Sequence, residues 1–376
     1  MSSVKVLMIS KALVVGAYHK KLEEIAKLGV DLHLVVPQSW GHQKLEISKG
    51  NGYAIYPLSS FFKGKNHFHF YMYLWHTIKK IKPDIVHIDE EHYSIVTFQA
   101  MRLAKKANAR ALFFTWQNIY KRYPFPFSFI QEYIFKNADS AIAGNDEAGD
   151  VLRKKGFDKN IAVIPQFGVD PDMFNKINSD NLRSRIGLET DKFVVGFMGR
   201  LVDEKGVRDL IRAVALVRGR ERLLVLFIGS GPSEREIIEL ASHEKLEHNI
   251  KLIDHVPSMD VPAYMNCFDC LVLPSLTRRN WKEQFGRVLI EAMSCEVPVI
   301  GSSSGEIPKV IADAGMVFQE GDINDLARRI ELLLYDKELR ASLGKKGRER
   351  VLARYTQKKI ALDTYGIYEG LMSKQC

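Results

Sequence analysis

The feature that most constrains the fold is an alternation of short apolar segments with longer amphipathic ones, which runs along the chain twice. In the first half VKVLMIS, DLHLVVP, DIVHI, RALFFTW, SAIAG and IAVIP have the length and the Val, Ile and Leu content of buried strands. In the second half the same is true of FVVGFMG, LLVLFIG, IKLID, DCLVLP, PVIG and GMVF. Helical patterns separate most of these segments. Each half therefore predicts an α/β fold with a doubly wound parallel sheet, and the chain predicts two Rossmann-like domains.

The alternation pauses at GVDPDMF (Gly168–Phe174), which we interpret as the linker between two domains of ordinary size. A less regular section covers residues 40–60, and the tail from Asp322 onward is helical and highly charged. Open α/β sheets bind ligands at the carboxyl ends of their strands. We therefore expect the functional residues to face a central cleft between the two sheets.

The stretch from Pro274 to Pro298 gives the most specific indication of a ligand. The apolar CLVLP predicts a strand that stops at a proline, a polar loop follows, and VLIEAM predicts a helix that begins near Gly286. Glu283 then lies just before the helix N-terminus, and Glu291 lies about one and a half turns inside it. The free amides and the dipole of such a terminus favour an anion. Glu283 and Glu291 can then accept hydrogen bonds from hydroxyl groups on either side of a bound phosphate. A phosphate between two hydroxylated groups is characteristic of a nucleotide sugar.

Two other predicted strand ends also suit an anionic ligand. Gly199 and Arg200 follow the strand FVVGFM, and Lys205 lies a few residues later at a helix start, so a guanidinium and an ammonium can neutralise a diphosphate there. Gly16, after the first strand, can let the backbone approach a sugar or a phosphate. Each feature also has an ordinary explanation, because paired glutamates occur by chance and surface Arg and Lys are common in loops.

The positive charge is concentrated in the first half of the chain. Residues 1–168 contain 23 Lys and Arg against 14 Asp and Glu, which accounts for the whole net charge of +9. Two segments there, Phe61–Lys80 and Tyr120–Phe129, are both aromatic and basic. This combination suits the headgroup region of an anionic membrane, with nucleic acid as the less favoured partner. Alternatively the rings are core and the lysines cover a helix over residues 66–81; we expect core burial for most rings and membrane contact for the patch as a whole.

Several absences bound the class of protein. No segment approaches the roughly 18 apolar residues of a membrane span, and the sequence enters a strand pattern at once, without a signal peptide. The cysteines at positions 267, 270, 295 and 376 suggest buried thiols, not a disulfide framework or a metal site. We expect a cytoplasmic protein, with peripheral association at the inner face of the membrane.

Four motifs carry a resemblance to a known family. They are EQFGRVLIE (Glu283–Glu291), GRLVDEKG (Gly199–Gly206), GSGP (Gly229–Pro232) and the GVDxxxF linker. Together they resemble glycosyltransferase family 4, the retaining group 1 glycosyltransferases, and the resemblance covers the whole chain. It implies the glycosyltransferase B architecture. Residues 1–168 would bind the acceptor, residues 169–356 would bind the nucleotide sugar, and a helix in residues 357–376 would cross back onto the first domain.

The resemblance also implies a role for each matched residue. Glu291 would hold the ribose hydroxyls, and Glu283 would hold hydroxyls of the donor sugar. Arg200 and Lys205 would bind the diphosphate and stabilise it as a leaving group, without a metal or another cofactor. Further donor contacts would come from Gly199, from the backbone near Val256 and from the amides of Phe285, Gly286, Arg287 and Val288. The family often has a histidine where this chain reads WQN, so Gln117 is expected to contact the donor sugar instead.

The expected function is therefore a retaining, hexosyl-type glycosyltransferase. It would move a sugar from a UDP- or GDP-linked donor to a hydroxyl of a lipid-linked, polysaccharide or other glycan acceptor, by attack on the same face of the sugar. One alternative is a nucleotide-sugar 2-epimerase of the same architecture, and another is a non-catalytic nucleotide-binding protein. A nicotinamide-dependent dehydrogenase ranks low, because neither ISKALVVGAYHKK nor FMGRLVDEKG supplies the expected GxGxxG.

Overall fold

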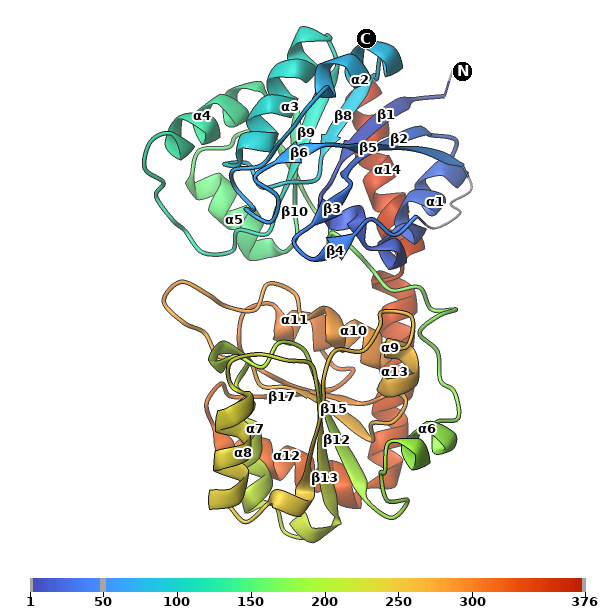
Figure 1. Ribbon diagram of the computed structural model, residues 1–376, viewed down its shortest axis with the longest axis vertical. Coiled ribbons are helices and arrows are strands. Elements are labelled where there is room, and N and C mark those ends of the chain that lie inside the picture. The colour runs from blue at the N-terminus through green and yellow to red at the C-terminus, as the bar shows by residue number, and fades with distance from the viewer. Residues whose placement is uncertain (1–2, 48–51, 374–376) are drawn as a thin grey trace. The chain divides into compact units, whose positions relative to one another are not determined.

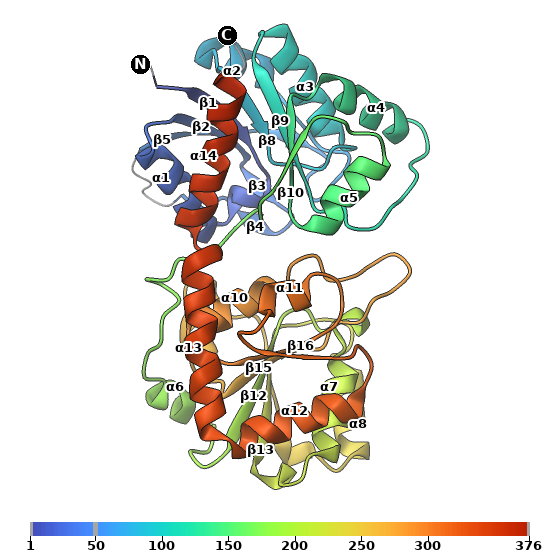
Figure 2. The same cartoon turned by 180° about the vertical axis from the view of Figure 1, so that it is seen from behind.

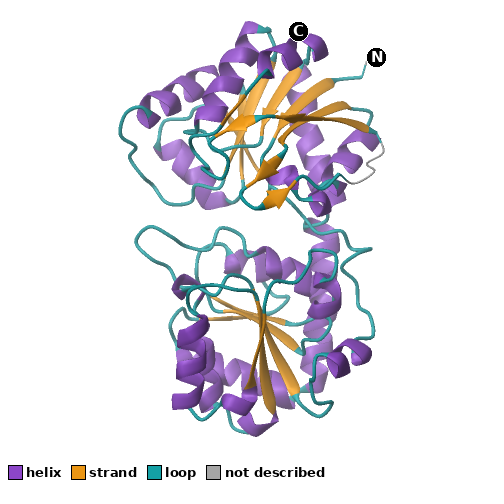
Figure 3. Cartoon of the chain, in the orientation of Figure 1, coloured by secondary structure: helices purple, strands orange, loops and turns teal. Residues whose placement is uncertain are grey.

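The computed structural model describes residues 3–47 and 52–373, so Cys376 lies outside the described residues. The chain forms two compact units (Figure 1). Unit 1 comprises residues 1–168 together with residues 357–376, and unit 2 comprises residues 169–356. Each unit contains a parallel sheet flanked by helices (Figure 3), and this confirms the predicted α/β class with two doubly wound sheets. No helix in the described part of the chain is both long enough and apolar enough to cross a membrane.

Unit 1 is built on a seven-stranded parallel sheet with the order β11-β10-β9-β8-β1-β2-β5. The strands are β1 (Lys5–Ile9), β2 (Asp31–Pro37), β5 (Tyr53–Leu58), β8 (Ile85–Ile88), β9 (Arg110–Thr115), β10 (Ser140–Ala143) and β11 (Asn160–Val163). From β1 the chain first adds β2 and β5 on one side, and it then adds β8 to β11 on the other side. The direction of winding therefore reverses between β1 and β8.

The two faces of this sheet have separate cores, because successive side chains of a strand point to opposite faces. Leu7 and Ile9 of β1 pack against one group of helices, and Val6 and Met8 pack against the other. The first group is α2 (Leu74–Ile81), α3 (Ile95–Lys106) and α4 (Phe127–Asn137), and the second includes α1 (Lys20–Lys27) and α14 (Gln357–Ser373). Helix α5 (Asp146–Lys154) connects β10 to β11. In Figure 2 the last helix, α14, lies against the sheet on the same side as α1.

Helix α14 is attached to unit 1 by polar contacts as well as by its apolar face. The hydroxyl of Tyr368 lies 2.7 Å from Nδ1 of His87, which is on the central strand β8. Burial, followed by the charge of Lys21, lowers the pKa of His87 well below its usual range, so the ring is neutral. At the start of the helix, the Gln357 side chain donates to the carbonyl of Gly168 at 2.9 Å and accepts from its amide at 3.2 Å.

Unit 2 contains a six-stranded parallel sheet with the order β14-β13-β12-β15-β16-β17. The strands are β12 (Phe193–Met198), β13 (Leu223–Ile228), β14 (Ile250–Ile253), β15 (Cys270–Leu273), β16 (Val299–Ser302) and β17 (Met316–Phe318). The helices are α6 (Asp180–Arg185), α7 (Val207–Leu216), α8 (Glu234–His243), α9 (Val261–Met265), α10 (Arg287–Ser294), α11 (Ile307–Ile311), α12 (Ile323–Tyr335) and α13 (Lys337–Arg354). Here the winding reverses between β12 and β15. All six strands predicted from the apolar segments of this half are present.

The section at residues 40–60 is more regular than expected from the sequence. It contains β5, which pairs in parallel with β2 and forms one edge of the sheet. Pro57 lies inside this strand, and a proline is tolerated at an edge because no ladder partner needs its missing N–H. A short hairpin of β3 (Ser39–Trp40) and β4 (Gln43–Lys44) precedes it.

The helix predicted over residues 66–81 is wrong in its first half. Helix α2 begins only at Leu74, after Tyr73, whose φ of 58° lies in the left-handed region. The preceding strand β7 (Phe70–Tyr71) pairs antiparallel with β6 (Ser60–Phe61). The run HFHF at residues 67–70 alternates histidine with phenylalanine, which suits a strand better than a helix.

The expectation that most rings of the two aromatic segments are core is also wrong. Tyr71 is buried, but seven rings between residues 61 and 129 are exposed: Phe61, Phe62, Phe68, Tyr73, Tyr120, Phe125 and Phe129. Their segments lie in loops and at element ends, where neighbouring elements do not cover both sides of a ring.

We expect the contact between Tyr368 and His87 to stabilise unit 1. The change Tyr368→Phe removes the partner of a buried ring nitrogen and should lower the free energy of unfolding by about 1–3 kcal/mol. Tyr365→Phe, on the same helix but only half-buried, is the matched control and should change it by less than about 0.5 kcal/mol. Urea titration followed by circular dichroism measures both, and equal effects would contradict the assignment.

Candidate functional site

In unit 2, the residues at the carboxyl ends of β12 and β15 lie where the winding of the sheet reverses. Gly199 and Arg200 follow β12, and Pro274 and Ser275 follow β15. Adjacent strands whose connections leave in opposite directions open a crevice between them, and open α/β sheets bind their ligands at this place. Most of the residues that the sequence indicated in this unit lie on the loops around this point.

The main polar contact at this point joins Lys205 to Glu283. The Lys205 ammonium lies 2.6 Å from Oε2 of Glu283, and the hydroxyl of Ser275 donates to the same oxygen at 2.8 Å. The ammonium also lies 5.3 Å from the centre of the Trp281 ring. Glu283 is only 7% exposed, so its charge is compensated by a fixed neighbour and not by water. The pair brings together two residues 78 positions apart in the sequence.

Two glycines allow the loops of this pair to come close. Gly206 has a φ of +68°, and a Cβ atom there would lie 1.9 Å from the carbonyl oxygen of Pro274. Gly305 has a φ of +54°, and a Cβ atom there would lie 2.0 Å from the carbonyl oxygen of Glu283. Glycine is the only amino acid that can adopt a positive φ without strain and also leave room for so close a backbone approach. The position of the ion pair therefore depends on both glycines.

Helix α10 begins where the sequence predicted, directly after Gly286. Gly286 has a left-handed φ of 76°, and its own amide and that of Val288 donate to no acceptor among the described residues. One turn inside the helix, Oε1 of Glu291 lies 2.9 Å from Nε of Arg287. Glu291 is mostly buried and Arg287 is partly exposed, so the arginine closes the outer side of the carboxylate.

The remaining predicted residues of unit 2 differ in exposure. Arg200 is exposed, and its guanidinium makes no hydrogen bond or ion pair with any described residue. Val256 is buried in the loop after β14, at the same edge of the sheet. Phe285 is buried as well, and its ring packs edge-on against Tyr355 at 5.7 Å between centroids.

Gly16 and Gln117, the two predicted residues of the first half, lie in unit 1. The amide of Gly16 donates to Oε2 of Glu46 at 2.8 Å, so it is already bonded within the chain. Gln117 lies two residues after the end of β9 and is 7% exposed. Its side-chain nitrogen donates to the carbonyl of Ile119, while its buried Oε1 has no partner among the described residues. Neither contact tests the roles that were predicted for these two residues.

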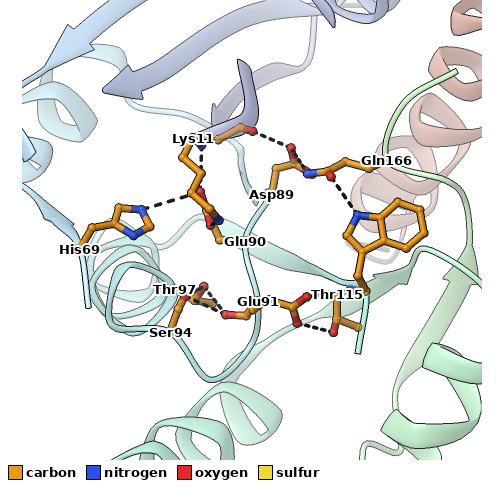
Figure 4. Close-up of polar contacts among 11 residues, drawn as sticks. Lys11, His69, Asp89, Glu90, Glu91, Ser94, Thr97, Thr115 and Gln166 are labelled. Carbon is orange, nitrogen blue, oxygen red and sulfur yellow. Dashed lines mark hydrogen bonds and ion pairs between the residues drawn. The ribbon is translucent and has the colours of Figure 1, made fainter. Parts of the chain in front are cut away.

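Unit 1 holds a second polar cluster at its own reversal point, between β1 and β8 (Figure 4). Glu90, which follows β8, accepts from the amide of Lys11 at 2.8 Å and also pairs with the Lys11 ammonium. Nε2 of His69 lies 3.7 Å from the same carboxylate. Burial, followed by the charge of Lys11, lowers the pKa of His69 to about 3, so this ring is neutral. The buried hydroxyl of Tyr71 also has no partner among the described residues.

The two carboxylates beside Glu90 are fixed by hydrogen bonds. Oδ2 of Asp89 accepts from Ser10 at 2.7 Å and from Gln166 at 2.9 Å. Glu91 accepts at 2.6 Å from the hydroxyl of Thr115, the last residue of the neighbouring strand β9. Burial raises the pKa of both Asp89 and Glu91, although these hydrogen bonds oppose the shift. Three successive carboxylates at a strand end therefore have three separate sets of partners.

This cluster was not predicted from the sequence. A usable signal was present, because Asp89, Glu90 and Glu91 directly follow the predicted strand DIVHI, just as Gly199 and Arg200 follow FVVGFM. Within residues 3–47 and 52–373, no group of three His, Cys, Asp or Glu side chains is arranged to hold a metal ion. The expectation that the protein needs no metal stays a prediction.

Comparison with known proteins identifies the family. Residues 19–172 match the family described as Glycosyltransferase Family 4, and residues 178–350 match the family described as Glycosyl transferases group 1. The two matches follow one another along nearly the whole chain. The protein belongs to the group 1 glycosyltransferases of family 4, as its motifs predicted.

The individual curated relatives have low sequence identity to this chain and match only part of it. The capsular polysaccharide biosynthesis glycosyltransferase CapM of Staphylococcus aureus is 31% identical over 191 residues, which are 50% of this chain and 48% of that protein. The chain spans about half the length of the curated relatives it matches.

Solved structures share the fold over almost the full length. A glycosyltransferase from Rickettsia africae has a TM-score of 0.78 at 20% identity, with 99% of each chain covered. HepE of Anabaena, solved in complex with UDP, has a TM-score of 0.76 at 17% identity, with 98% of this chain and 100% of that chain covered.

We expect the glycine at position 206 to be essential for this site. Gly206→Ala should lower the stability of unit 2 by about 3 kcal/mol, because a strained backbone conformation is combined with an overlap against the Pro274 carbonyl. Gly321→Ala is the matched control: its φ is +77°, but no atom lies within 4 Å of the added Cβ, and it should cost about 1 kcal/mol. Denaturant unfolding compares the two, and a Gly206→Ala variant as stable as Gly321→Ala would show that the close approach is not needed.

Proposed function

We propose that this protein is a retaining glycosyltransferase that moves a hexosyl group from a UDP- or GDP-linked donor to a hydroxyl of a lipid-linked, polysaccharide or other glycan acceptor. The observation that carries the proposal is the fixed Lys205–Glu283 pair at the reversal point of unit 2. The exposed Arg200 lies close to it in sequence, directly after the first residue that follows β12. Family membership supports the reaction class. That a structural neighbour binds UDP supports a nucleotide in unit 2.

The charges of unit 2 suit the departure of a nucleoside diphosphate. Arg200 and Lys205 supply two positive groups, and the amides of Gly286 and Val288 supply donors at the start of α10. As the bond between the anomeric carbon and the phosphate oxygen breaks, negative charge develops on the diphosphate, and these groups stabilise it without a metal. The acceptor oxygen bonds to the same face of that carbon, and the departing phosphate takes the hydroxyl proton.

The carboxylates of unit 2 suit the two hydroxylated parts of the donor. Glu283 is held rigidly by Lys205 and Ser275, so its second oxygen can accept from sugar hydroxyls in a fixed direction. Glu291 lies one turn inside α10 beside Arg287, and we assign it to the ribose hydroxyls. The base would contact backbone near Val256. This assignment separates the sugar, the phosphates and the nucleoside along one edge of the sheet.

We assign the acceptor to unit 1 and place its reactive hydroxyl near Glu90 and Lys11. A carboxylate and an ammonium that are already paired can accept from one hydroxyl and donate to a second, which suits a polyhydroxylated or phosphorylated acceptor. Gln117 follows the neighbouring strand and is proposed to contact the transferred sugar. An acceptor of this kind, attached to a lipid, would be met in the cytoplasm at the inner face of a membrane.

The first test is a thermal-shift panel of UDP, GDP, ADP, CMP and NAD with a metal chelator present. We expect one nucleoside diphosphate to raise the melting temperature, and Glu291→Ala to weaken its binding by about 1–3 kcal/mol through lost ribose hydrogen bonds. Glu239→Ala, an exposed glutamate on α8, is the control and should bind as the parent protein does.

The panel also distinguishes the alternatives. No shift with any nucleoside diphosphate would refute the donor site, and a shift that Glu291→Ala leaves unchanged would refute the role of that residue. A nucleotide that binds normally while its sugar conjugate is neither transferred nor hydrolysed would favour a non-catalytic nucleotide-binding protein.

We expect Lys205 to act mainly on the rate of transfer. Lys205→Met should lower kcat by about 10²–10³-fold if the ammonium stabilises charge that develops only in the transition state, with a smaller change in donor affinity. Steady-state kinetics with the conjugate of the nucleotide found in the panel measure both constants. The double variant Lys205→Met/Glu283→Gln controls for the carboxylate left unpaired, and equal losses in kcat and in affinity would point to simple binding.

A further inference from the structure

Exposed aromatic rings in this protein are gathered in two short segments of unit 1. Among the described residues eight Phe and Tyr side chains are exposed, and seven of them lie between residues 61 and 73 or between residues 120 and 129. Phe125 is 82% exposed, and Phe62 is 56% exposed. Single apolar side chains on a protein surface are ordinary and need no explanation. Several exposed rings gathered in two short segments are unusual, and such a group indicates an interaction site.

Ring contacts join the two segments into one surface. Phe68 of the first segment packs edge-on against Phe127 of the second, with 5.4 Å between the ring centroids. A second connection runs from His67 to Tyr93 and from Tyr93 to Tyr123, at 4.8 and 4.2 Å. We call residues 61–73 and 120–129 together the aromatic surface. Because the two segments contact each other directly and through Tyr93, they form one continuous surface and not two separate loops.

The half-buried rings form a base under the exposed ones. Phe61 stacks on Phe70 at 5.0 Å, and Phe62 lies 6.3 Å from the same ring. Phe129 contacts Phe98 on helix α3 at 6.0 Å. Phe61, Phe62 and Phe129 are therefore held by packing, so inserting them into an apolar phase would not require these rings to be ordered first.

The charge of the aromatic surface is entirely positive. Lys63 and Lys65 are exposed between the rings of the first segment, and Lys121 and Arg122 are exposed in the second. Neither segment contains an aspartate or a glutamate. The surface thus offers apolar rings and cations side by side, which suits a partner that is apolar within and anionic at its boundary.

We propose that the aromatic surface binds the headgroup region of an anionic lipid bilayer. Phenylalanine rings have no polar atom and gain free energy by entering the boundary of the acyl chains, while lysines and arginine remain at the level of the phosphates. A protein partner fits less well, because the central parts of protein interfaces are depleted in lysine. The binding does not depend on a donor or on transfer, and its failure would leave the proposed reaction untouched.

Co-sedimentation of the full-length protein with vesicles tests the proposal. We expect binding to vesicles that contain phosphatidylglycerol, little binding to pure phosphatidylcholine, and a steep loss as salt is raised. Lys121→Ser/Arg122→Ser should weaken binding by about tenfold or more. Phe125→Ser/Phe62→Ser should weaken it as well, and it should remove the part that survives high salt.

Matched controls separate this surface from the general charge and apolarity of the protein. Lys345→Ser/Lys346→Ser removes two exposed lysines from α13, and Leu216→Ser/Ile238→Ser removes two exposed apolar side chains from unit 2. Both controls should bind vesicles as the parent protein does. Unchanged melting temperatures show that the variants fold.

Three results would overturn the proposal. The first is no binding to anionic vesicles at low salt, and the second is binding that the variants of the aromatic surface leave unchanged. The third is binding to a single-stranded oligonucleotide that is tighter than vesicle binding and is lost in the same variants, since this would assign the surface to nucleic acid.

Discussion

A parallel strand can reach its neighbour only through a crossover that covers one face of the sheet, and this constraint decides where the polar residues of the protein can gather. When successive crossovers continue in one direction, each strand end is covered by the next connection. Where the direction reverses, the connections leave on opposite sides and the ends of two adjacent strands stay accessible. Each unit has one such reversal, between β1 and β8 in unit 1 and between β12 and β15 in unit 2.

The two reversals carry the same arrangement of charge. In unit 1 the lysine comes from the loop after the first strand and pairs with Glu90, which follows the strand across the reversal. In unit 2 Lys205 likewise follows the first strand and pairs with Glu283, which follows the strand across the reversal. Each ion pair connects the residues that follow the two strands, beside one backbone hydrogen bond in each unit: from Asp89 to Ile9 and from Leu276 to Glu204. The charged side chains at each reversal therefore have fixed partners before any ligand binds.

The sequence predicted those parts of the fold and the site that depend on local patterns. Buried strands are recognisable because parallel sheets need continuous apolar runs, and the start of α10 is recognisable from Gly286 and the periodic VLIEAM. β5 (YAIYPL) was missed because Pro57 and two tyrosines interrupt that pattern. The exposed rings at residues 61–73 were misjudged because an aromatic residue has the same letter whether or not a neighbour covers it. The contact of Lys205 with Glu283, across 78 positions, depends on the sheet order, which no local pattern contains.

The return of α14 to unit 1 has a consequence for the order in which the protein is made. Unit 2 is one uninterrupted stretch, whereas unit 1 is assembled from residues 1–168 and a helix that lies beyond all of unit 2. During synthesis the sheet of unit 1 emerges first, but the face that Ile360 and Tyr368 cover stays open to water until α14 has been translated. Unit 2 can complete its core earlier, although it begins later. Unit 1 is therefore the last part of the protein to finish folding. Until α14 docks, its exposed apolar face is prone to aggregation.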